Sequence, residues 1–69
     1  MKVIVNVRNS AIPPWSTIED SLREVLPGLT DCRVNGLNTE ATFEVGNTAE
    51  HVGRALKGAD FVVCWRFDQ

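Results

Sequence analysis

Apolar and polar residues alternate at the start of the chain, where three valines take every second position of residues 2–8. A period of two is typical of a strand with one apolar and one polar face. Ile4 is the one apolar residue on the otherwise polar face. Residues 60–67, DFVVCWRF, are apolar at nearly every position, which predicts a further strand near the end of the sequence.

Two segments between these strands carry apolar residues at helical spacing, which predicts two helices. Ser16 stands three residues before Glu19, and Asn47 stands three residues before Glu50, so we expect Ser16 and Asn47 to be the N-caps. The apolar stripes are Ile18, Leu22, Val25 and Leu26 in the first helix and Ala49, Val52 and Leu56 in the second. Pro27-Gly28 and Gly58 are expected to end them.

Residues 30–45 alternate on both sides of Asn35-Gly36, a dipeptide typical of a two-residue hairpin turn of type I′. Such a turn places Val34 opposite Leu37 and Cys32 opposite Thr39, so that the apolar residues share one face. A longer loop that reaches Thr39 is the alternative.

The resulting element order is βαββαβ, which predicts an α+β domain over residues 1–69 with a ferredoxin-like two-layer sandwich. Right-handed crossovers give an antiparallel sheet with strand order 4-1-3-2 and both helices on one face. The last strand is then an edge, and the other face of the sheet is uncovered.

The uncovered face is the first candidate surface. We expect Phe61, Val63, Trp65 and Phe67 to face the helices, which leaves Val62, Cys64 and Arg66 beside Ile4 on the uncovered face. Lys2, Arg8 and Arg33 join them there, so we expect this face to be basic. Because residues 61–65 carry no charge or proline to protect an edge, we also expect a homodimer through this strand or face.

The loop 9–15 is the second candidate surface, because the fold does not require these extra residues. Pro13 and Pro14 restrict the backbone before Trp15, a residue type that is enriched at binding hot spots. The alternative is that Trp15 folds back onto the helix edge and closes one end of the core.

Composition narrows the classes of function. The chain has 69 residues, a net charge of −2, two cysteines and one histidine. No apolar run is long enough to span a membrane, and the apolar stretch at the start of the sequence is too short for a signal peptide.

Two distant cysteines indicate free thiols and a reducing, cytoplasmic compartment. Because His51 lacks a carboxylate along its helix and the cysteines lie far apart, we expect no catalysis, metal or cofactor.

These observations favour a small non-enzymatic protein-binding module, an adaptor or an inhibitor of a larger protein machine. The alternative is a domain that binds nucleic acid or a small ligand on the open sheet face. Nucleic acid is the less favoured partner, because the first and third strands offer no aromatic residue there for base stacking. The candidate interaction residues are Pro13, Pro14, Trp15, Ile4, Arg8, Arg33, Val62, Cys64 and Arg66.

Overall fold

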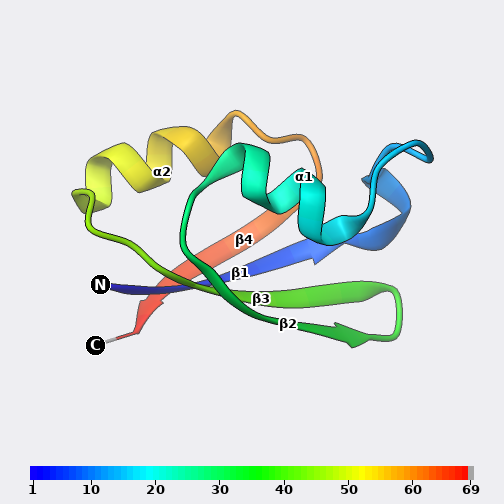
Figure 1. The fold of residues 1–69 in the computed structure, drawn as a ribbon, viewed down its shortest axis with the longest axis horizontal. Helices are drawn as coiled ribbons and strands as arrows, with labels where there is room; N and C mark the ends of the chain where they lie inside the picture. The colour runs from blue at the N-terminus through cyan, green and yellow to red at the C-terminus, as the bar shows by residue number, and fades with distance from the viewer. Residues whose placement is uncertain (69) are drawn as a thin grey trace.

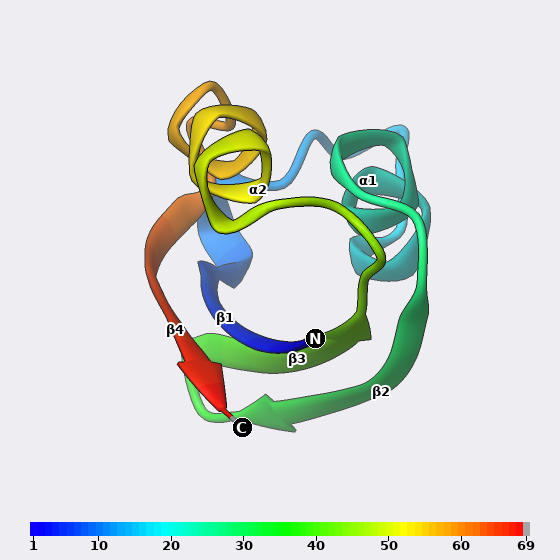
Figure 2. The same ribbon diagram turned by 90° about the vertical axis from the view of Figure 1, so that its left-hand side faces the viewer.

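The computed structural model describes residues 1–68 and shows the predicted order of strands and helices (Figure 1). The elements are β1 (Lys2–Arg8), a short 3₁₀ turn (Asn9–Ala11), α1 (Ile18–Val25), β2 (Leu29–Asn35), β3 (Asn38–Glu44), α2 (Ala49–Lys57) and β4 (Val62–Asp68). The strands form one sheet in the order β2-β3-β1-β4, antiparallel at each pairing. Both helices lie on the same face of this curved sheet (Figure 2). The predicted α+β architecture and strand order are therefore confirmed.

The core lies between the sheet and the helices. Its centre is β1, whose Val3, Val5 and Val7 are fully buried, as their alternation predicts. The side chains that close over these valines come from both helices and from β3, namely Leu22, Leu26, Val52, Leu56, Ala41, Phe43 and Val45. The opposite face of the sheet is left without a covering layer (Figure 2).

Both helices begin one residue later than predicted. Thr17 and Thr48, in extended conformation, are the N-caps, and their hydroxyl oxygens accept hydrogen bonds from the backbone N–H groups of Asp20 (3.1 Å) and His51 (3.2 Å). The prediction of Ser16 and Asn47 was wrong because a threonine, which is also a favoured N-cap residue, follows each of them.

The hairpin turn also differs from the prediction. Its central residues are Gly36 and Leu37, since Asn35 pairs with Asn38 and Val34 pairs with Thr39. Gly36 has a φ of 64° while Leu37 has no positive φ, which matches a type II′ turn rather than type I′. The register moves by two residues, so each residue keeps its predicted face even though the predicted partners were wrong.

A β-bulge in β4 corrects the predicted orientation of that strand. Trp65 pairs with Val5 on the helix side and Arg66 pairs with Ile4 on the open side, as predicted. The register then shifts, and Val62 pairs with Val7. Val62 therefore packs against the core instead of facing outward, and Val63, predicted to face the helices, is 52% exposed. An extra residue in one strand reverses the alternation beyond it.

Two glycines illustrate how tightly the layers fit. Gly28, which connects α1 to β2, has a φ of 95°, and a Cβ atom there would overlap the carbonyl oxygen of Glu44. The Glu44 N–H also donates to the Gly28 carbonyl oxygen at 2.8 Å, and this hydrogen bond holds the two backbones close together. Gly53 in α2 is different, because an added Cβ would stand 3.7 Å from Cζ2 of Trp65, an ordinary van der Waals distance.

We predict that Gly53→Ala raises the free energy of unfolding by about 0.5–1 kcal/mol, because alanine lowers the entropy of the unfolded chain and favours helix. Gly28→Ala should lower it by about 2 kcal/mol or more through backbone strain and overlap. Urea unfolding followed by circular dichroism measures both. A destabilised Gly53→Ala protein would show that α2 and β4 have no room for a methyl group.

Candidate functional site

The loop between β1 and α1 is fastened to the hairpin turn by Asn9. The Asn9 backbone N–H donates to the carbonyl oxygen of Leu37 (3.0 Å), and its Nδ2 donates to that of Gly36 (3.3 Å). Its Oδ1 accepts a hydrogen bond from the hydroxyl of Thr39, a fully buried residue. One side chain and its backbone therefore hold the start of the loop at three points.

The middle of the loop is restricted by apolar packing and by prolines. Ile12 packs against the core, and its N–H donates to the carbonyl oxygen of Asn9 (3.2 Å). Beyond it, the Ser16 N–H donates to the carbonyl oxygen of Pro13 (3.1 Å), which closes a four-residue turn. Pro14 takes the second position of this turn, where its fixed φ is favourable, and Trp15 takes the third.

The end of the loop is fastened to α1. The hydroxyl groups of Ser16 and Ser21 share a hydrogen bond of 2.8 Å, and Ser21 is buried in the first turn of α1. The next residue, Thr17, is the N-cap of the same helix. The backbone that carries Trp15 is thus anchored on both sides by hydrogen bonds.

Trp15 itself is 86% exposed. The alternative in which this side chain folds back and closes the core is therefore wrong. The end of the core beneath the loop is filled by Ile12 and Phe61, which pack against the buried cluster. A large apolar side chain on an anchored backbone is left facing solvent.

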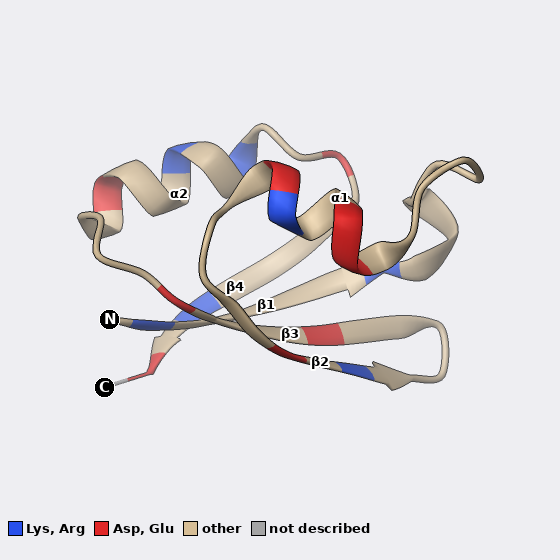
Figure 3. Cartoon of the chain, viewed as in Figure 1, with Lys and Arg blue, Asp and Glu red and all other residues tan. Residues whose placement is uncertain are grey.

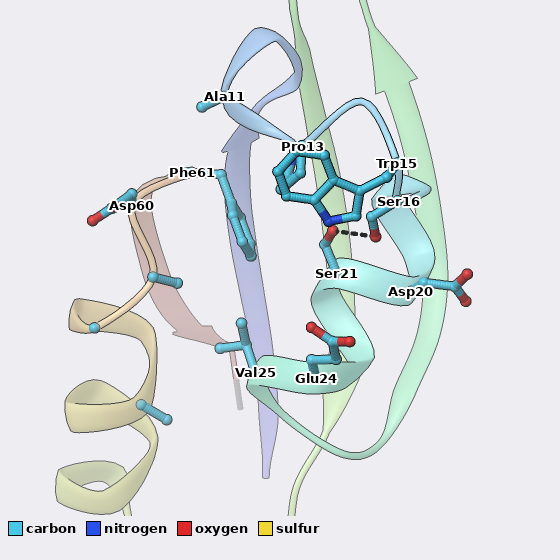
Figure 4. Close-up of a pocket in the computed structure, with 13 residues that line it drawn as sticks. Ala11, Pro13, Trp15, Ser16, Asp20, Ser21, Glu24, Val25, Asp60 and Phe61 are labelled. Atoms are coloured by element: carbon cyan, nitrogen blue, oxygen red, sulfur yellow. Dashed lines mark hydrogen bonds between the residues drawn. The ribbon is translucent and has the colours of Figure 1, made fainter.

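Trp15 stands at the rim of a groove of about 940 Å³ (Figure 4). The groove runs between α1 and the segment that leads from α2 into β4, and its apolar lining includes Pro13, Val25 and Phe61. Three acidic residues also line it, namely Asp20, Glu24 and Asp60. Among residues 1–68, no lysine or arginine belongs to this lining, so the charged residues that line the groove are all acidic.

The open face of the sheet was expected to be basic, and this expectation was wrong. Lys2, Arg8, Arg33 and Arg66 lie there as predicted, but acidic residues lie among them (Figure 3). Lys2 is 3.7 Å from Asp68 and Arg33 is 3.8 Å from Asp31, while Glu40 occupies the position on β3 opposite Arg33 in the strand register. The face carries both signs of charge, which reduces its attraction for phosphate groups.

The predicted interaction residues therefore fall on two separate surfaces. Pro13 and Trp15 line the groove, and Pro14 lies between them in the turn. Ile4, Cys64 and Arg66 meet on the open face, where strand pairing places Arg66 beside Ile4. Val62 belongs to neither surface because the bulge turns it inward. At the centre of the open face, Asn6 Oδ1 is buried without a hydrogen-bond partner within residues 1–68.

The ionisable groups that were weighed for catalysis are dispersed. Burial, assisted by Glu19 and Asp31, raises the pKa of the Cys32 thiol, which makes it a weaker nucleophile. Cys32 and Cys64 are free thiols on the opposite edge strands β2 and β4, and Cys64 is exposed on the open face of the sheet, as predicted. Within residues 1–68, no group of three or more His, Cys, Asp or Glu side chains is placed to hold a metal ion.

Most of the groove was not anticipated from the sequence. Phe61 was predicted to face the core, and neither Glu24 nor Asp60 was predicted to belong to a binding site. Their approach depends on where α1 and the segment between α2 and β4 lie on the sheet, a tertiary relationship that no local spacing encodes. The one feature of the sequence that could have pointed to this part of the groove is Asp60-Phe61, an acidic residue followed by an aromatic one just before a strand.

Comparison with known protein families, curated protein sequences and solved structures finds no match to this chain. Among the described residues, no helix is both long and apolar enough to cross a membrane.

Proposed function

We propose that this protein is a small non-enzymatic module that binds another protein through Trp15 and the adjoining groove. The observation that carries the proposal is a tryptophan that is 86% exposed on a backbone anchored at both ends. Tryptophan is among the residues most enriched at binding hot spots. An anchored loop has less conformational entropy to lose when a partner binds, so more of the contact energy appears as affinity.

The groove suits this role better than the open face does. The groove combines an exposed aromatic ring with apolar walls and charges of one sign, which gives a partner both contact area and orientation. The open face instead mixes acidic and basic residues around short side chains. An adaptor or an inhibitor of a larger machine is the form of activity that suits a small domain with such a groove. The free thiols favour a cytoplasmic location.

Selection from a displayed library of random peptides tests this proposal. We expect the wild-type protein to enrich peptides whose binding is lost in Trp15→Ala. The free energy of unfolding of that variant should lie within about 0.5 kcal/mol of the wild-type value, because the side chain that is removed is mostly in water. Leu37→Ala is the matched control, since Leu37 is also 86% exposed but lies at the hairpin turn.

Selected peptides that bind wild type, Trp15→Ala and Leu37→Ala equally well would contradict the proposal. A strong loss of stability in Trp15→Ala would contradict it as well, because the side chain would then serve packing.

We also propose that a second copy of the chain docks on the edge of β4. This edge carries Val63, which is 52% exposed, and the partly exposed Phe67. A paired edge would cover both side chains and add buried area to a small core.

Light scattering over a concentration series should show a dimer for the wild type and a folded monomer for Val63→Lys. The control is Val34→Lys on β2, the opposite edge strand, which should leave the dimer intact. Val62→Lys is unsuitable because Val62 packs against the core. A wild-type monomer at every concentration would exclude the homodimer.

A further inference from the structure

The acidic residues of the groove differ from most others in the chain. Six of the nine acidic residues have a cationic partner within 4.0 Å, among them Glu44, which receives the N-terminal ammonium group at 3.0 Å. Within residues 1–68, Glu24, Glu40 and Asp60 have no such partner. Two of these three, Glu24 and Asp60, line the groove.

These two residues come from different elements. Glu24 lies on α1 next to Val25, whereas Asp60, in the segment before β4, turns its carboxylate away from Phe61 (Figure 4). The third acid, Asp20, is 3.9 Å from Arg23 and also points away from the apolar wall. The uncompensated negative charge beside the wall is therefore that of Glu24.

An aromatic face stands at the end of the same groove. The Trp15 ring lies over Pro13, above the shared hydrogen bond of Ser16 and Ser21 (Figure 4). Tryptophan is the side chain whose ring attracts a cation most strongly, and arginine is the cation that most often stacks on it. The planar guanidinium also forms paired hydrogen bonds with a carboxylate.

We propose that the groove binds an arginine-bearing segment of the partner protein, with a guanidinium stacked on Trp15 and drawn by the negative charge of Glu24. This inference rests on the proposed protein-binding function and names the chemistry of its partner. The stacking supplies contact that a neutral residue lacks, and the unpaired carboxylate of Glu24 opposes the approach of an acidic segment. Because the groove is open to solvent, binding weakens as ionic strength rises.

The test is a titration of ¹⁵N-labelled protein with a capped, glycine-spaced peptide that carries two arginines. The same peptide with citrulline, a neutral side chain of nearly the same shape, is the ligand control. We expect the arginine peptide to shift the Trp15 indole N–H signal and the amide signals of Gly58 and Ala59, which also line the groove. The citrulline peptide should shift them little at the same concentrations.

Trp15→Ala should weaken binding by about 2- to 5-fold, the effect of losing one cation–aromatic contact at an exposed site. Glu24→Gln should weaken it as well, whereas Glu40→Gln should not. Glu40 is the matched control, because it is equally unpaired but lies on the open face of the sheet.

Equal binding of the citrulline peptide would overturn the inference, as would a Glu40→Gln effect as large as that of Glu24→Gln. Absence of groove shifts with the arginine peptide would also overturn it. Selection of neutral peptides in a Trp15-dependent manner would overturn the arginine preference while leaving the protein-binding function supported. Selection without any dependence on Trp15 would instead contradict the protein-binding function itself.

Discussion

The structure depends on the burial of β1 between its two neighbouring strands. This strand hydrogen-bonds to β3 on one side and to β4 on the other, and its three valines are removed from water by the helices. Each of these valines gains about 1.5–3 kcal/mol from burial, which makes β1 a major source of stability in so small a domain. Every other element is placed by its contact with this strand or with the layer above it.

The same constraint explains why Trp15 remains outside. Two helices of eight and nine residues cover the central strands and bury Leu22, Val52 and Leu56 against them. Ile12 and Phe61 pack against this core from the loops, whereas Trp15 is 86% exposed. The loop is consequently held by polar contacts at Asn9 and Ser16, and its largest apolar side chain is free for another molecule.

The part of the fold that repeats a simple period could be predicted from the sequence. Alternating valines, two apolar stripes and a glycine-bearing hairpin are sufficient to specify the element order, the strand order and the buried faces. The errors arose where two adjacent residues satisfy the same physical rule. Ser16 and Thr17 both cap a helix, and Gly36 supplies a positive φ in either hairpin register.

The candidate site was harder to predict because it is assembled by packing. The loop with Trp15 is visible as an excess of residues between two elements. Of the residues that line the groove with it, Glu24 comes from the next helix, but Asp60 and Phe61 come from a segment far along the chain. The bulge at Val63 could not be predicted for another reason. Nearly every position of β4 is apolar, so the sequence shows no alternation from which a shift in register could be recognised. Tertiary contacts determine both the groove and the bulge.

The central claim is that the loop already holds Trp15 in its binding position before a partner arrives. Backbone ¹⁵N relaxation of the free protein tests it most directly, through the order parameters of the amides of Asn9, Ile12, Trp15 and Ser16. An anchored loop predicts values of about 0.85, equal to those of the strands. Values below about 0.6 at Trp15 and Ser16 would show a mobile segment and would contradict the claim.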